Sequence, residues 1–149
     1  MRVLVQRVAR AAVHVDGKTV GGIGEGLLVF VGVVEDDTKS DINYLVDKIA
    51  GLRIFEDSEG KMNLSMTDLG LSMLVVSQFT LCADCRKGRR PSFNGAANPA
   101  RAEEYYEKFI EKARNMGINV EAGTFQAMMD VELVNKGPVT IQLDSKKLY

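Results

Sequence analysis

The residues best suited to chemistry follow an apolar run that is rich in β-branched side chains. Ser77, Gln78 and Thr80 come at the end of this run, and Phe79 stands among them. A buried strand that ends in hydroxyl groups, an amide and a ring is typical of a strand that delivers polar groups to a cleft. If residues 74–81 form one strand, Ser77 and Phe79 share one face while Gln78 and Thr80 share the other. A core strand whose hydroxyl groups bond neighbouring backbone would show the same pattern.

A long segment rich in glycine and basic residues, 82–98, comes next. It contains a basic cluster made of Arg86, Lys87, Arg89 and Arg90. A loop of this length inside a compact domain is more often functional than idle. Arginine can bind two phosphate oxygens at once, and a ring such as Phe93 can stack on a base. The cluster therefore predicts contacts with a phosphodiester, and its alternative is a solvated run of charge.

The Gly137-Pro138 step separates two runs of alternating apolar and polar residues near the end of the chain. Proline cannot donate to a sheet ladder, and a cis peptide bond is reasonably favourable only before proline. Such a step can hold its carbonyl groups in a fixed, exposed direction, which would make it a steric ruler. An ordinary turn is the alternative, and we keep both interpretations open.

Two further motifs predict no special chemistry. Cys82 and Cys85 have the C-x-x-C spacing, but a zinc site needs about four ligands and a redox motif opens a helix in a βαβ unit. We therefore expect two ordinary thiols, no metal and no cofactor. His14, the single histidine, alternates with two valines and is expected to face outward without a catalytic role.

Composition indicates a soluble domain without a dominant charge. The chain has 149 residues, with 19 Lys and Arg against 20 Asp and Glu, so no whole-molecule field attracts a polyanion. We expect one domain over residues 1–149. Charge interrupts the N-terminal segment too early for a signal peptide, and no apolar run approaches the roughly 20 residues of a membrane span. A cytoplasmic location without membrane contact follows as the expectation.

Hydrophobic periodicity predicts more strand than helix. Helices are expected at 38–51, with a Thr38 and Asp41 capping box, and at 98–117, with Asn98 as the N-cap and Pro99 in the first turn. Strands are predicted over residues 1–8, 11–15, 26–34, 52–55, 74–81, 118–122, 128–135 and 139–143. The last two should form a hairpin-like pair around the Gly-Pro step. The predicted fold class is α+β, with a strongly curved, mainly antiparallel, barrel-like sheet and two covering helices.

Two separate segments together resemble a known enzyme family. Ser-Gln-Phe-Thr-Leu at 77–81 and Asn-Lys-Gly-Pro-Val-Thr at 135–140 resemble the paired signature of the D-aminoacyl-tRNA deacylases, also called D-tyrosyl-tRNA(Tyr) deacylases. Residues 6–8, 53–55 and 90–93 are similar to the same family, in the same order along the chain. Coincidence of two such motifs by chance is improbable.

The resemblance implies an enzyme that hydrolyses the ester between a D-amino acid, or glycine, and the 3′-terminal adenosine of tRNA. Its partner would be aminoacylated tRNA, and its role the proofreading and recycling of mischarged tRNA. It also implies a homodimer with active sites at the subunit interface. The family's cross-subunit Gly-cis-Pro motif corresponds to Gly137 and Pro138, whose carbonyl groups would meet the α-amino group and exclude an L side chain.

The same resemblance assigns roles to individual residues. Catalytic residues correspond to Ser77, Gln78, Phe79 and Thr80. Thr80 is a candidate nucleophile, but a threonine hydroxyl needs a base, and the sequence offers no evident partner. We therefore favour substrate assistance, in which the ribose 2′-hydroxyl helps water attack while Ser77, Phe79 and nearby backbone groups hold the ester.

The remaining roles concern tRNA binding. Phe125 and Met129 match the family's Phe-x-x-x-Met spacing and are expected to line the adenosine pocket, while residues 86–90 would contact phosphates. A non-catalytic RNA-binding module that uses the 86–90 loop is the main alternative. A thiol-dependent redox protein that uses Cys82 and Cys85 is a second.

Overall fold

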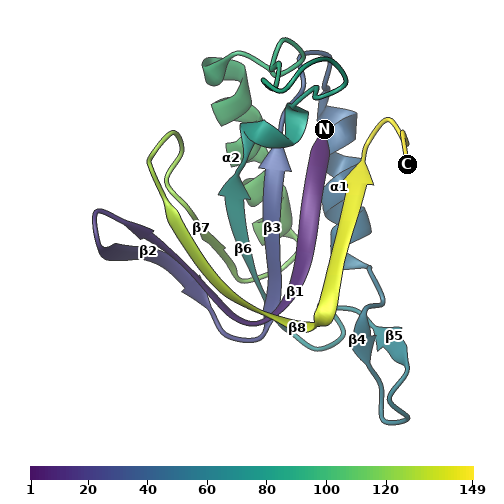
Figure 1. Cartoon of the computed structure of the whole chain (residues 1–149). Coiled ribbons are helices and arrows are strands. Elements are labelled where there is room, and N and C mark those ends of the chain that lie inside the picture. Colours follow the sequence, from purple (N-terminus) through teal and green to yellow (C-terminus); the bar gives the residue numbers. More distant parts are fainter.

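The computed structural model describes residues 1–149 and consists of one large curved sheet, a small hairpin and two α-helices (Figure 1). The elements in chain order are β1 (Arg2–Val15), β2 (Lys18–Ile23), β3 (Gly26–Gly32), α1 (Lys39–Ala50), β4 (Phe55–Glu56), β5 (Met62–Leu64), β6 (Ser72–Ser77), the 3₁₀ helix η1 (Phe79–Cys82), α2 (Pro99–Asn115), β7 (Val120–Ala122) and β8 (Asp130–Asp144). The predicted α+β class with a strongly curved sheet and two helices is confirmed.

The large sheet has the order β2-β1-β3-β6-β7, and β8 pairs with β1 along its other edge. β1 runs antiparallel to β2, β3 and β8, whereas β3-β6 and β6-β7 are parallel pairs. Parallel neighbours need crossover connections, and these contain α1 and α2. Both helices lie behind the sheet in Figure 1. The sheet is therefore mixed, with its antiparallel part built around β1.

The first strand prediction was too short. Residues 1–8 and 11–15 belong to one strand, β1, which pairs with β3 through its first half and with β2 through its second. Two exposed residues, Ala9 and Arg10, interrupt the apolar pattern where the partner changes. β1 ends in a tight turn, in which Asp16 and Gly17 both have positive φ values, 50° and 73°.

Both helices begin and pack as predicted. Thr38 and Asp41 form the capping box of α1, and the Asn98 side chain accepts a hydrogen bond from the backbone of Arg101 at the start of α2. The buried face of α2 carries Tyr105, Tyr106, Phe109, Ile110 and Ala113. These side chains pack with those of α1 against the sheet to form the larger apolar core.

A second, smaller core fills the inside of the curve. It consists of Val8, Ala11, Val13, Leu28, Leu74 and Val76. The curvature brings β2 towards β7, and a Cβ atom on Gly21 would lie 2.6 Å from the carbonyl oxygen of Ala122. Glycine is therefore required where the sheet approaches closure.

Three other predicted strands have different bounds. Residues 52–54 are not a strand, because the Ile54 carbonyl accepts from the Arg7 side chain and strand pairing starts at Phe55. β7 is shorter than predicted and begins at Val120. β6 ends at Ser77 rather than Leu81, since its partner β3 ends at Gly32 and the chain turns into η1.

The predicted hairpin around Gly137-Pro138 is wrong. Residues 128–135 and 139–143 do not pair with each other, because both halves of β8 pair with β1. Between the pairs Gln6↔Thr140 and Val8↔Asn135 the register shifts, so residues 136–139 lie opposite one β1 residue, Arg7. We call residues 136–139 the bulge.

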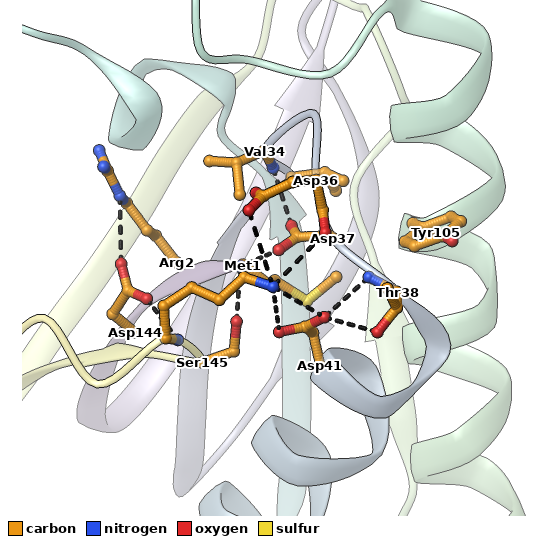
Figure 2. A network of polar contacts seen from close by, with 12 residues as sticks. Met1, Arg2, Val34, Asp36, Asp37, Thr38, Asp41, Tyr105, Asp144 and Ser145 are labelled. Atoms are coloured by element: carbon orange, nitrogen blue, oxygen red, sulfur yellow. Dashed lines mark hydrogen bonds and ion pairs between the residues drawn. The ribbon is translucent and has the colours of Figure 1, made fainter.

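Polar contacts fasten both ends of the chain to the start of α1 (Figure 2). The Met1 amino group is buried against the Asp37 carboxylate and donates to Ser145 Oγ at 2.7 Å. Lys146 Nζ lies 3.3 Å from Asp41 Oδ1. Burial of Asp41 opposes its ionisation, but hydrogen bonds, that of Ser145 foremost, outweigh burial and hold its pKa well below the ordinary value. No helix of the protein has both the length and the apolar character that a membrane crossing requires.

Candidate active site

A cavity of about 770 Å³ opens at the carboxyl ends of the parallel strands β3 and β6. Its walls come from β3, β6, η1, the start of α2, the segment that joins β7 to β8, and the start of β8. The lining residues are Val31, Val33, Val76, Ser77, Gln78, Phe79, Ala97, Pro99, Ala102, Phe125, Gln126, Ala127, Met128, Met129 and Val131. Most of this lining is apolar. In open α/β sheets ligands bind at this end of the strands, where connections diverge.

The turn after β6 brings three of the predicted catalytic residues to the cavity. The Gln78 backbone N–H donates to the Val31 carbonyl at 2.8 Å, and η1 begins directly afterwards. Ser77, Gln78 and Phe79 therefore all line the cavity, which the alternation of a continuous strand would not allow. Phe79 keeps 56 % of its surface exposed and packs against Phe93, with ring centroids 4.9 Å apart. Phe93 thus supports Phe79 instead of standing free in the basic loop.

Thr80 differs from its three neighbours. It is exposed and is not among the residues that line the cavity. Its Oγ1 accepts a hydrogen bond from Gln78 Nε2. The single histidine is engaged elsewhere, since His14 Nδ1 lies 3.0 Å from Thr19 Oγ1 and Nε2 lies 3.8 Å from Glu132. The geometry gives Thr80 a contact with the Gln78 amide and no basic side chain.

Phe125 and Met129, predicted from their spacing, line the same cavity as Ser77 and Phe79. Their segment is anchored to β6 through the Val75 carbonyl, which accepts from Gly123 N at 3.0 Å and from the Tyr106 hydroxyl at 2.8 Å. The Tyr106 and Phe125 rings are 5.9 Å apart. Burial raises the pKa of Tyr106 to about 12.

Sequence reasoning missed this anchor. Tyr106 lies on the buried face of α2, and nothing in the periodicity of the helix distinguishes it from Tyr105 or Phe109. Sequence reasoning also missed Pro99 and Ala102 as site residues, which line the cavity from the first turn of α2. The Asn98-Pro99 helix start directly after the long loop was an available signal for a segment near the site.

The four basic residues of the 86–90 cluster are all exposed. Arg86 forms an ion pair, because its Nη2 lies 2.6 Å from Asp84 Oδ2. Hydrogen bonds from Arg86 hold the pKa of Asp84 well below its usual range. Lys87, Arg89 and Arg90 form no ion pair of this kind. The cluster therefore offers three uncompensated positive charges and one compensated charge.

The bulge lies away from the cavity of its own chain. Gly137 and Pro138 are exposed, are joined by a cis peptide bond and do not line the cavity. Arg7, opposite the bulge, pairs with Leu27 of β3, whereas the cavity begins at Val31. Four strand residues span roughly 13 Å. Figure 1 shows the bend of β8 near β4 and β5, at the opposite end of the sheet from η1.

Arg7 of β1 hydrogen-bonds the backbone of the bulge. Its side chain is buried, with the residue 6 % exposed, and donates from Nε to the Lys136 carbonyl at 2.9 Å and from Nη1 to the Ile54 carbonyl at 2.6 Å. Three family-like segments that are distant in sequence therefore meet at one guanidinium group. In the sequence, Arg7 is one residue of the family-like segment 6–8 and has no role of its own. A buried arginine that satisfies backbone carbonyls is visible only in three dimensions.

The two cysteines have different environments. Cys82 is buried, donates to the Val33 carbonyl at 3.4 Å and has a pKa raised by burial, whereas Cys85 is exposed. A reactive thiol has a lowered pKa, so Cys82 has the opposite of the property a redox or nucleophilic role needs. No group of three or more His, Cys, Asp or Glu side chains is arranged to hold a metal ion.

Comparison with known proteins places the chain in a hydrolase family. A family model described as D-Tyr-tRNA(Tyr) deacylase matches residues 4–144. Proteins named D-aminoacyl-tRNA deacylase from Thermotoga petrophila and Koribacter versatilis are 59% and 60% identical over 149 residues, covering 100% of both chains in each case. The chain therefore belongs to the D-Tyr-tRNA(Tyr) deacylase family, and the predicted resemblance is confirmed.

Two solved structures share the fold of this chain. A structure titled c-Myc DNA Unwinding Element Binding Protein is 40% identical, with a TM-score of 0.92 over 97% of this chain and 98% of its own. A probable eukaryotic D-amino acid tRNA deacylase shares the fold at 20% identity, with a TM-score of 0.82 over 95% of this chain and 97% of its own. The expectation of an enzyme, a hydrolase of the deacylase class, is confirmed by the family.

Proposed function

We propose that the protein hydrolyses the ester between a D-amino acid, or glycine, and the 3′-terminal adenosine of tRNA, and that it rejects L-aminoacyl-tRNA. The observation that carries this proposal is the apolar cavity that joins Ser77, Gln78 and Phe79 to Phe125 and Met129. Members of the family carry the name of this activity. Action on charged tRNA also implies a cytoplasmic role in recycling mischarged tRNA.

The cavity suits an adenosine. Its apolar walls provide surfaces for the faces of a base, and Phe125 and Met129 line it from the segment fastened to β6. Single-stranded nucleic acid is commonly held by stacking its unpaired bases on aromatic side chains. The exposed charges of Lys87, Arg89 and Arg90 lie on the loop that follows η1, where the phosphates of the tRNA end would continue.

The chemistry we propose is attack by water on the ester carbonyl, assisted by the ribose 2′-hydroxyl. The carbonyl becomes a tetrahedral oxyanion, the bond to the ribose 3′-oxygen breaks, and that oxygen leaves as a hydroxyl with the proton released by water. Ser77, Gln78 and backbone N–H groups at the start of η1 would hold the ester and stabilise the oxyanion. Thr80, which lies outside the cavity lining and bonds the Gln78 amide, supports Gln78 and is not the nucleophile.

We infer that a second copy of the chain distinguishes D-aminoacyl-tRNA from L-aminoacyl-tRNA. The exposed bulge is not part of its own cavity, which supports its insertion into the cavity of a partner in a homodimer. There the carbonyl groups of Gly137 and Pro138 would meet the substrate's α-amino group and leave no room for an L side chain. Exclusion works for every amino acid, whereas better binding of D side chains would need a separate solution for each one.

The direct test is to incubate the protein with D-Tyr-tRNA, L-Tyr-tRNA and Gly-tRNA in parallel and to measure the released amino acid. Release from the D and glycyl substrates, with little from the L substrate, is expected. Binding of all three without release would instead support a non-catalytic RNA-binding module. A Cys82→Ser, Cys85→Ser variant should keep the activity, and its loss in a folded protein would favour a thiol mechanism.

A further inference from the structure

The bulge is a four-residue interruption of an otherwise regular strand pair, and such a segment needs support at both ends. Its first carbonyl, that of Lys136, accepts the hydrogen bond from Arg7 Nε at 2.9 Å. Lys136 Nζ also lies 2.7 Å from Glu25 Oε1 at the surface. These contacts fix where the bulge leaves β1, but neither reaches its far end at Val139.

A single side chain, Asn135, closes the far end. Asn135 Oδ1 accepts from the Val139 backbone N–H at 2.8 Å, and Nδ2 donates to the Val139 carbonyl at 3.2 Å. The amide thus bonds both backbone groups of the residue that ends the bulge. This pairing replaces the ladder hydrogen bonds that the bulge interrupts.

Thr140 connects this clamp to β1. Its Oγ1 lies 2.9 Å from Asn135 Nδ2 and 3.1 Å from Gln6 Nε2, so both amides can donate to it. Gln6 and Thr140 are also opposite each other in the β1-β8 register. A chain of side-chain hydrogen bonds therefore runs from β1 through Thr140 and Asn135 to the end of the bulge.

We propose that Asn135 is a positioning residue that sets the direction of the Gly137 and Pro138 carbonyl groups, with Thr140 as its support. The inference rests on the proposed function. Arg7 and Asn135 fix Lys136 and Val139, so the two residues between them have little freedom to move. Only a carboxamide supplies the acceptor and the donor that Val139 requires. An aspartate would accept from the Val139 N–H but would face the Val139 carbonyl with a negative charge.

Loss of the Asn135 hydrogen bonds should affect chiral selectivity more than substrate binding. Rejection by steric clash requires a rigid obstacle, because a functional geometry must be held to within about 0.5 Å. An obstacle that can retreat leaves space for the L side chain. Loosening the clamp should therefore raise hydrolysis of L-aminoacyl-tRNA, while the cavity that holds adenosine stays unchanged. A role in stability alone would lower both activities together.

The test compares Asn135→Asp with Asn43→Asp, which makes the same chemical change on the exposed face of α1. Initial rates on D-Tyr-tRNA and L-Tyr-tRNA, oligomeric state and thermal midpoint are measured for both variants and the parent. We expect the D-to-L rate ratio to fall at least tenfold in Asn135→Asp and to be unchanged in Asn43→Asp. Thr140→Val should move the ratio in the same direction by a smaller factor.

An unchanged ratio in a folded Asn135→Asp protein would overturn the inference while leaving the proposed function intact. If that variant does not fold, an unchanged ratio in Thr140→Val has the same force. Failure of the parent protein to release D-tyrosine would instead contradict the proposed function itself.

Discussion

The cavity and the bulge are stabilised by different kinds of interaction. The cavity is lined mostly by apolar side chains from several segments, and its walls are held by packing and by the anchor at Val75. In the bulge only Val139 packs against the larger apolar core, and hydrogen bonds with Arg7 and Asn135 hold the backbone. The cavity can accept a ligand with small adjustments of its side chains, whereas the bulge presents its backbone carbonyl groups in one direction.

This difference separates two tasks that an editing enzyme must perform. An apolar cavity provides affinity for the part that all substrates share, and small changes in its walls alter affinity by modest factors. In the proposed function, the rigid backbone obstacle provides discrimination. The cavity and the bulge lie at opposite ends of one sheet, so under this proposal each meets its counterpart on a second copy of the chain.

Gly137→Ala should affect the bulge most severely. Gly137 has a φ of +136°, and a Cβ atom there would lie 2.8 Å from Arg7 Nη2. Backbone strain of this kind costs on the order of 1–3 kcal/mol, so the D-to-L rate ratio should fall by roughly 5- to 150-fold. Gly60→Ala is the matched control, since Gly60 also has a positive φ, +75°, but stands in open space. An equal loss of selectivity in both variants would contradict the account.

Tyr106→Phe tests the anchor of the cavity wall through its pH dependence. The Tyr106 pKa is raised to about 12 by burial, so the folded protein resists ionisation that the unfolded chain undergoes near its ordinary value of 10. Its contribution to stability is complete below pH 10 and is lost as the pH rises towards 12. Between these values the parent should lose about 2 kcal/mol more unfolding free energy than the variant. If the unfolding free energies of the parent and the variant change equally with pH, the Tyr106 hydroxyl is not buried.

Phe125→Ala should weaken the cavity without touching the bulge. Loss of one stacking side chain costs about 1–3 kcal/mol per base, so KM for D-Tyr-tRNA should rise about tenfold or more. The D-to-L ratio should stay constant, because the obstacle is unaffected. Steady-state rates on both substrates make this comparison, and a changed ratio would mean that the two regions are not independent.

Arg89→Ala tests the basic loop. Three uncompensated charges at Lys87, Arg89 and Arg90 predict a slope of log affinity against log salt of about −2, and loss of one should reduce its steepness by about 0.7. Lys48→Ala, on an exposed part of α1, is the control. Affinity for a non-hydrolysable tRNA end should be measured over a range of salt. If the affinity of the parent protein does not change with salt, the loop does not contact the tRNA phosphates.

Thr80→Ala should have the smallest effect. Thr80 accepts a hydrogen bond from Gln78 and does not line the cavity, so its loss should change kcat by about threefold, equivalent to less than 1 kcal/mol. Single-turnover rates on D-Tyr-tRNA measure this directly. Complete loss of activity in a folded variant would restore Thr80 as the nucleophile.

Sequence patterns predicted the parts of the molecule that local chemistry controls. The caps at Thr38 and Asn98 follow from side chains that bond nearby backbone groups. Patterns failed where distant segments decide. The strand predicted to run to Leu81 ends at Ser77 because its partner ends, and β8 continues through Gly137-Pro138 because β1 pairs with both halves.

The candidate site shows the same division. Its cavity residues could be proposed from motifs at 77–81 and from the Phe125 and Met129 spacing, and the structure brings them together. Arg7 and Tyr106 could not be predicted, because each acts on the carbonyl of a residue far along the chain. Buried polar side chains of this kind look like ordinary strand or helix residues in the sequence.

The central claim is that the obstacle acts on the cavity of a partner chain, and mixed dimers test it most directly. One chain carries Phe125→Ala and Met129→Ala, which remove its own cavity, and the other carries Gly137→Ala. Different affinity tags allow isolation of the mixed dimer. In it the intact cavity meets the intact bulge of the other chain, so D-selective hydrolysis is predicted. Hydrolysis as unselective as that of the Gly137→Ala homodimer would show that the bulge acts within its own chain and would contradict the account.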